Sequence, residues 1–86
     1  MRVSSVIEVR PLSFPQIWLR FDDGVEGVVD LSALVLLDGV FEPLKNADFF
    51  ARVRVDDEIG TIAWLNGADV DPLVLHSAVT GKPLRF

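Results

Sequence analysis

The feature that most constrains this sequence is an Asp23-Gly24 step between two apolar segments, residues 16–21 and 25–30. Asp-Gly in this setting is a strong β-hairpin signal, because glycine adopts the left-handed backbone that a tight turn requires. A two-residue loop would pair Phe21 with Glu26 and mix apolar and acidic groups on one face. A loop over residues 22–24 separates them through four cross-strand pairs: Phe21 with Val25, Ile17 with Val29, Trp18 with Val28, and Arg20 with Glu26. We therefore predict the three-residue loop, with Gly24 left-handed.

This register gives the hairpin an apolar face and a face that carries Trp18 with Val28. A domain this small rarely covers both faces of a sheet, so we expect one face to form the core and the other to remain accessible. An exposed tryptophan beside a valine is typical of an interface. The alternatives are that helices cover both faces, or that the connection between Pro11 and Pro15 shields Trp18. The candidate interaction residues are Trp18, Val28, Trp64, Asn66 and Asp69.

Three further strands are predicted from alternating polarity. In residues 3–10, Val3, Ser5, Ile7 and Val9 are expected to share one face. Residues 52–56 and 61–65 flank an acidic turn that Gly60 closes, which predicts a second hairpin.

The helices are predicted from capping residues. Asp30 is expected to cap a short helical turn, and Asn46 or Asp48 to cap a short helix. That helix holds two of the side chains expected to fill the core, which are Phe41, Leu44, Phe49 and Phe50. Asp71-Pro72 begins a helix of about residues 71–79 that Gly81 ends, with Leu75, Ala78 and Val79 on its buried side. The fold class is therefore α+β: an antiparallel sheet of about five strands in two hairpins, short helices and one C-terminal helix.

Length and charge limit the possible functions. A chain of 86 residues predicts a single domain over residues 1–86, and the absence of cysteine excludes disulfides and thiolate metal sites. A formal charge of −5 disfavours direct nucleic-acid binding, and a basic protein is a more natural partner than DNA. The alternative is that the acidic surface serves only solubility. The longest purely apolar run, residues 34–37, is too short to span a membrane. No secretion signal is recognisable at the N-terminus, so we expect a cytoplasmic protein.

No set of residues predicts catalysis. His76 is the single histidine, and Ser77 next to it points in another direction on a helix, so the pair cannot act as base and nucleophile. We expect His76 to pack or cap near the helix end. Asn66, Asp69 and Asp71 offer oxygen ligands without a calcium-binding pattern, and we expect them to bond their own loop and cap the helix. A metal-dependent enzyme at residues 66–71 is a minor alternative; no cofactor is expected.

Several of these segments resemble a known family. Phe21-Asp22-Asp23-Gly24, Val29-Asp30-Leu31, Leu44 with Phe49, Trp64-Leu65-Asn66-Gly67-Ala68-Asp69 and Pro72 are similar to the domain-of-unknown-function family 2442. The resemblance covers residues 3–76 and implies a compact α+β domain of bacterial origin. It also implies that some members carry a helix-turn-helix domain and that others pair with a small neighbouring protein, as in toxin–antitoxin pairs. The family has no established catalytic residues to carry over.

The sequence thus predicts a non-enzymatic protein-interaction domain, the acidic antitoxin-like partner of a small basic protein. The alternative is a homodimeric regulatory or ligand-sensing module that associates through the Trp18 side of the hairpin or a sheet edge.

Overall fold

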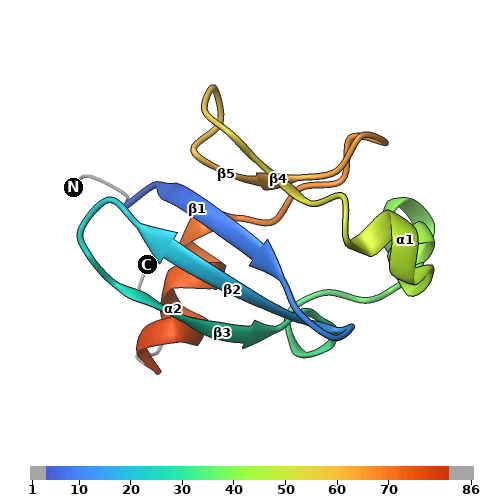
Figure 1. The fold of residues 1–86 in the computed structure, drawn as a ribbon, viewed down its shortest axis with the longest axis horizontal. Coiled ribbons are helices and arrows are strands. Elements are labelled where there is room, and N and C mark those ends of the chain that lie inside the picture. The colour runs from blue at the N-terminus through green and yellow to red at the C-terminus, as the bar shows by residue number, and fades with distance from the viewer. Residues whose placement is uncertain (1–3, 82–86) are drawn as a thin grey trace.

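The computed structural model describes residues 4–81. The elements follow one another in this order: β1 (Val6–Pro11), β2 (Gln16–Phe21), β3 (Glu26–Asp30), the 3₁₀ helices η1 (Leu31–Ala33) and η2 (Gly39–Lys45), α1 (Ala47–Phe50), β4 (Arg54–Asp56), β5 (Thr61–Ala63) and α2 (Pro72–Thr80). The five strands form two antiparallel sheets, β1-β2-β3 and β4-β5. Figure 1 shows α2 behind the three-stranded sheet and α1 at the far end from the hairpin turn. The predicted α+β class is confirmed, with the strands divided between two sheets.

The hairpin of β2 and β3 has the predicted three-residue loop. The Phe21 N–H donates to the Val25 carbonyl at 2.8 Å, and Gly24 is left-handed with φ 87°. A carboxylate oxygen of Asp23 accepts the Val25 N–H at 3.0 Å, so the loop satisfies its own backbone. The predicted pairs follow: Ile17 with Val29, Trp18 with Val28, and Arg20 with Glu26.

Strand β1 departs from the predicted alternation because it contains a bulge. Its register with β2 shifts between Val6, opposite Phe21, and Glu8, opposite Arg20. Ile7 is the extra residue and is 55% exposed, whereas Val6 is 2% exposed in the core. The prediction that Ile7 shares a face with Val9 is therefore wrong. Val3 lies outside the described residues. An inserted residue moves the side chains that precede it to the opposite face of the strand. A prediction from simple alternation assumes that no residue is inserted and therefore misses this change.

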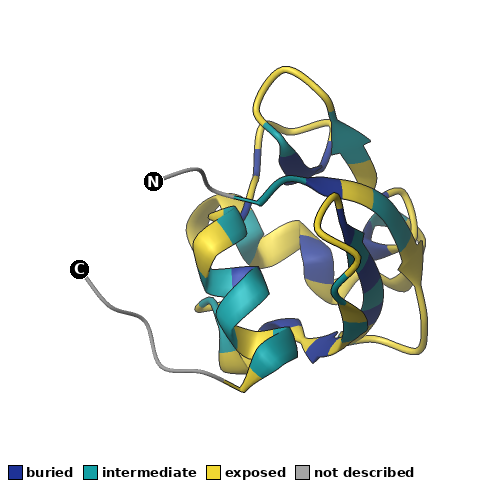
Figure 2. Ribbon diagram, turned by 90° about the vertical axis from the view of Figure 1, so that its left-hand side faces the viewer, coloured by how far each residue is buried: buried dark blue, intermediate teal, exposed yellow. Residues whose placement is uncertain are grey.

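The core lies between α2 and the inner face of the three-stranded sheet and continues toward α1 (Figure 2). It contains the inward side chains of β2 and β3, with Phe50, Trp64 and Leu75. Of the four side chains predicted to fill the core, Leu44 and Phe50 are buried, and Phe41 and Phe49 pack against them while partly exposed. Asn46 caps α1, since its side chain accepts the Phe49 N–H at 3.1 Å.

The second hairpin has the predicted turn. Gly60 is left-handed at φ 70°, and its N–H donates to Asp56 O at 2.8 Å. A further bond of 3.0 Å from Val6 N–H to Gly60 O joins this turn to β1.

Helix α2 begins and ends as the sequence predicts. Asp71 accepts the Leu73 N–H at 2.8 Å, Pro72 is the first helical residue, and Gly81 closes the end with φ 73°. Leu75 is buried and Val79 packs against the core, but Ala78 is exposed. The prediction for Ala78 is wrong because the inward side of the helix runs through Leu75 and His76, on the other flank.

Gly27 lies in close contact with α2. A Cβ placed on Gly27 would lie 3.0 Å from Cγ1 of Val79. The glycine inside this strand therefore makes room for a helix side chain.

We expect Gly27→Val to destabilise the fold by about 1–3 kcal/mol, because added methyl groups would overpack the contact with α2. Urea unfolding measures the change. The matched control places the substitution in a Val79→Ala background, where the cost should fall by about half or more through coupling. An equal cost in both backgrounds would show that α2 is not the obstacle.

Candidate functional site

Trp18 lies at the centre of the outer face of the three-stranded sheet, between two arginines. Arg10 stands opposite Trp18 on β1, and Arg20 follows it by two residues on β2. Both guanidinium carbons lie 5.5 Å from the centroid of the indole ring. Cations at this distance are attracted to the ring, so the two arginines hold the indole in place. We call this surface the Trp18 face; it comprises Glu8, Arg10, Trp18, Arg20, Glu26 and Val28.

Glu8 connects the two arginines. Its carboxylate lies 3.1 Å from Arg10 Nη2 and 2.9 Å from Arg20 Nη2. Arg20 Nε lies 3.5 Å from Glu26 and makes no hydrogen bond within residues 4–81. Exposed ion pairs contribute little to stability, so their main effect is to position the side chains. Sequence reasoning missed Glu8 and Arg10 as members of this surface, although their alternation along β1 was a usable signal.

The Trp18 face is open and partly apolar. Val28 is 51% exposed, and Leu12, from the connection between the first two strands, is 45% exposed. Together with Trp18, Arg10, Arg20 and Glu26 they line a shallow hollow of about 360 Å³. The connection therefore borders Trp18 without covering it. Tryptophan and arginine are the residue types most enriched at energetically important positions of protein interfaces, so this face has the chemistry of a contact surface.

The other three candidate residues do not belong to the Trp18 face. Trp64 is 1% exposed, and its indole N–H donates to Phe50 O at 3.1 Å, so it is a core residue. Asn66 donates to Val40 O at 2.9 Å and accepts from Ala68 N at 3.1 Å. Asp69 is exposed, at a bridge to Ala63. Trp18 and Val28 are direct neighbours, as a cross-strand pair.

We expect Trp64→Phe to destabilise the fold by about 1–3 kcal/mol, because it removes core volume and a buried hydrogen bond. The matched change Trp18→Phe should cost less than about 1 kcal/mol, since that ring lies at the surface. Urea unfolding of both variants measures the difference. Equal costs would contradict the assignment of one tryptophan to the core and the other to the surface.

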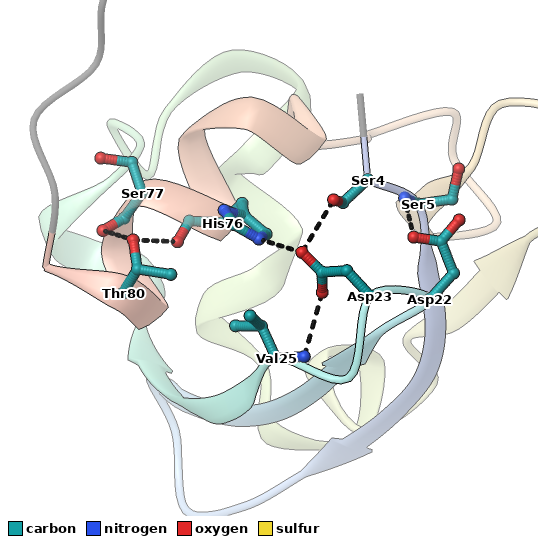
Figure 3. A network of polar contacts seen from close by, with 8 residues as sticks. All are labelled: Ser4, Ser5, Asp22, Asp23, Val25, His76, Ser77 and Thr80. Carbon is teal, nitrogen blue, oxygen red and sulfur yellow. Dashed lines mark hydrogen bonds and ion pairs between the residues drawn. The ribbon is translucent and has the colours of Figure 1, made fainter. Parts of the chain in front are cut away.

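A polar network joins the hairpin loop to α2 (Figure 3). His76 Nε2 lies 2.8 Å from Asp23 Oδ2, and the Ser4 hydroxyl donates to the same oxygen at 2.9 Å. The imidazole also packs edge-on against Phe21, with centroids 4.8 Å apart. Serine and histidine both bind the aspartate, so the imidazole does not lie between them as a catalytic triad requires. The arrangement fastens α2 to the hairpin.

The pKa of Asp23 lies below its ordinary value of 3.8. The backbone N–H of Val25 is the largest cause, followed by the hydrogen bond with His76; the Ser4 hydroxyl contributes less. These donors favour the charged carboxylate. Because the pKa is depressed in the folded state, Asp23 contributes stability above pH 3.8, and this contribution is lost as the pH falls through the folded pKa.

We expect His76→Ala to raise the pKa of Asp23 toward 3.8 without reaching it, since the Val25 N–H remains. Ser4→Ala, the matched control, should raise that pKa by less. An NMR titration of the Asp23 carboxyl carbon measures both changes. An unchanged pKa in His76→Ala would show that the histidine does not bind the carboxylate in solution.

The described residues contain neither a group of metal ligands nor a helix that could span a membrane. Across residues 4–81, no three side chains of the His, Asp or Glu type converge to hold a metal ion. The Asp71 carboxylate of the 66–71 loop already caps α2. No helix within the same residues is long and apolar enough to cross a bilayer.

Comparison with known proteins identifies the family. No curated protein and no solved structure matches the chain. The model of a family described as "Protein of unknown function (DUF2442)" matches residues 6–81, which extend from the first residue of β1 to the glycine that closes α2. Since this match spans most of the 86 residues, the chain belongs to the DUF2442 family.

Proposed function

We propose that this protein is a non-enzymatic protein-interaction domain whose contact surface is the Trp18 face. The observation that carries the proposal is the position of Trp18, fixed between Arg10 and Arg20 on the outer face of the three-stranded sheet. An indole held in place loses little conformational entropy when a partner covers it, which favours binding. The exposed Val28 and Leu12 beside it supply apolar area.

The partner we propose is a small basic protein, in a pair of the antitoxin kind. The chain carries thirteen Asp and Glu residues against eight Lys and Arg residues, for a formal charge of −5. This imbalance attracts a basic protein and accelerates encounter with it. Pairing with a small neighbouring protein is also what the family resemblance implies.

The test is co-expression with the product of the adjacent gene. We expect the two proteins to co-purify, and Trp18→Ala to weaken the complex by at least about 2 kcal/mol, or about 30-fold in Kd, as is typical of a central interface tryptophan. The matched control is Leu65→Ala, which truncates an exposed residue outside the Trp18 face and should leave the Kd within about twofold. Isothermal titration calorimetry measures both.

Two results would contradict this function. A wild-type chain that stays unbound, and gives no protection against the co-expressed neighbour, would exclude the antitoxin-like pair. A wild-type chain that sediments as a dimer by itself, and as a monomer after Trp18→Ala, would instead support the homodimeric module, for which the exposed Leu12 and Val28 are the favouring observation.

A further inference from the structure

Strand β3 ends the three-stranded sheet with an unpaired edge. The strand order is β1-β2-β3, so among residues 4–81 only β2 pairs with β3. The Val25 carbonyl accepts the Phe21 N–H, so the backbone N–H and C=O groups of Val25 point toward β2. Because these groups alternate in direction along an antiparallel strand, those of Gly27 and Val29 also point toward β2. The N–H and C=O groups of Glu26, Val28 and Asp30 therefore point away from the sheet. This row of backbone groups is a template for one more strand.

The side chains of the same three residues carry a distinct pattern. Glu26, Val28 and Asp30 are all exposed and lie on the Trp18 face of the strand, in the order acidic, apolar, acidic. One row across the sheet runs Arg10, Trp18, Val28. The next row runs Glu8, Arg20, Glu26, so that negative, positive and negative side chains alternate from strand to strand.

We propose that the basic partner binds by adding an antiparallel strand to the edge of β3. The added strand continues each row: a cation beside Glu26, an apolar side chain beside Val28, and a second cation beside Asp30. Opposite charges placed directly across neighbouring strands stabilise the pairing, and backbone hydrogen bonds supply the affinity. The occupant is thus an extended segment with a basic-x-apolar-x-basic pattern. This inference rests on the proposed function and specifies how the partner binds.

Charge also decides against a second copy of this chain as the occupant. Two copies of β3 could pair in a symmetric antiparallel register in which Val28 of one copy lies opposite Val28 of the other. All three residues with outward backbone groups then take part in the pairing. That register places Glu26 of each copy directly opposite Asp30 of the other, and like charges across a strand pair are destabilising. The acidic residues at the edge of β3 therefore disfavour pairing with a second copy of the chain and favour pairing with a basic strand.

The first test removes one backbone hydrogen-bond donor at the outer edge of β3 and preserves the hydrogen bonds between β2 and β3. Val28→Pro deletes an N–H that points away from β2, so the internal pairing is retained. Val28→Thr is the matched control, since it is also β-branched and keeps the N–H. We expect Val28→Pro to weaken the complex with the neighbouring gene product at least about tenfold, and Val28→Thr to remain within about twofold. Circular dichroism verifies that both variants fold.

A second arm uses a defined probe, the blocked peptide Thr-Lys-Thr-Val-Thr-Lys-Thr, with Thr-Glu-Thr-Val-Thr-Glu-Thr as its control. We expect the lysine peptide to shift the amide NMR signals of Glu26, Val28 and Asp30, with weaker binding at higher salt. The glutamate peptide should leave them unchanged. Equal shifts with both peptides, or none with either, would overturn the proposed charge pattern.

A third arm needs no partner. Glu26→Lys places a cation opposite Asp30 of a second copy in the symmetric register, so we expect this variant to dimerise in sedimentation experiments. Glu26→Gln, and Glu26→Lys combined with Val28→Pro, should stay monomeric. A monomeric Glu26→Lys would overturn the edge geometry.

The arms also separate this inference from the proposed function. Should a folded Val28→Pro variant bind the partner as wild type does while Trp18→Ala still weakens the complex, the Trp18 face stands and strand addition is wrong. If the wild type binds no neighbouring protein, the proposed function is wrong. The peptide titration and the dimerisation of Glu26→Lys still test whether the edge of β3 accepts another strand.

Discussion

The hydrogen bond between Phe21 N–H and Val25 O, across the turn that Gly24 allows, is the constraint on which the structure depends. It sets the register of β2 with β3, and a shift by one residue would move every side chain to the opposite face. With this register, Ile17, Leu19 and Phe21 enter the core, and Trp18 and Val28 remain outside. The same bond directs the outer backbone of β3 toward solvent. The core, the Trp18 face and the outer edge of β3 thus have one origin.

The bulge in β1 completes the outer surface. It allows Val6 to be buried beside the second hairpin while Glu8 faces outward, opposite Arg20. Without the extra residue, these two side chains would share a face. Glu8 then bridges Arg10 and Arg20, and both guanidinium groups lie near the indole. One inserted residue therefore allows Val6 to pack in the core and Glu8 to bind the two arginines on the outer face.

The two proposals use adjoining parts of one sheet, which share Glu26 and Val28, and they are compatible. The Trp18 face provides an aromatic anchor, and the edge of β3 provides backbone groups and carboxylates. Helix α2 lies on the other side, held by His76 at the hairpin loop and by the close contact of Val79 with Gly27. Binding at the edge and the outer face would therefore leave the core as it is, as expected for a preorganised surface. In the proposed complex, the acidic residues along the edge would complement the charge of the basic strand.

Sequence alone determined the features that depend on a few neighbouring residues. The hairpin loop, the caps at Asn46 and Asp71, and the glycine that ends α2 all follow from hydrogen bonds or backbone preferences within about five positions. The tertiary structure decided what depends on distant segments: the burial of Trp64 under Phe50, the bulge at Ile7, the exposure of Ala78, the contact of His76 with Asp23, and the division of the strands into two sheets. Residues far apart in the chain meet only when the core packs, and packing favours the arrangement with the most buried apolar area, which no local pattern specifies.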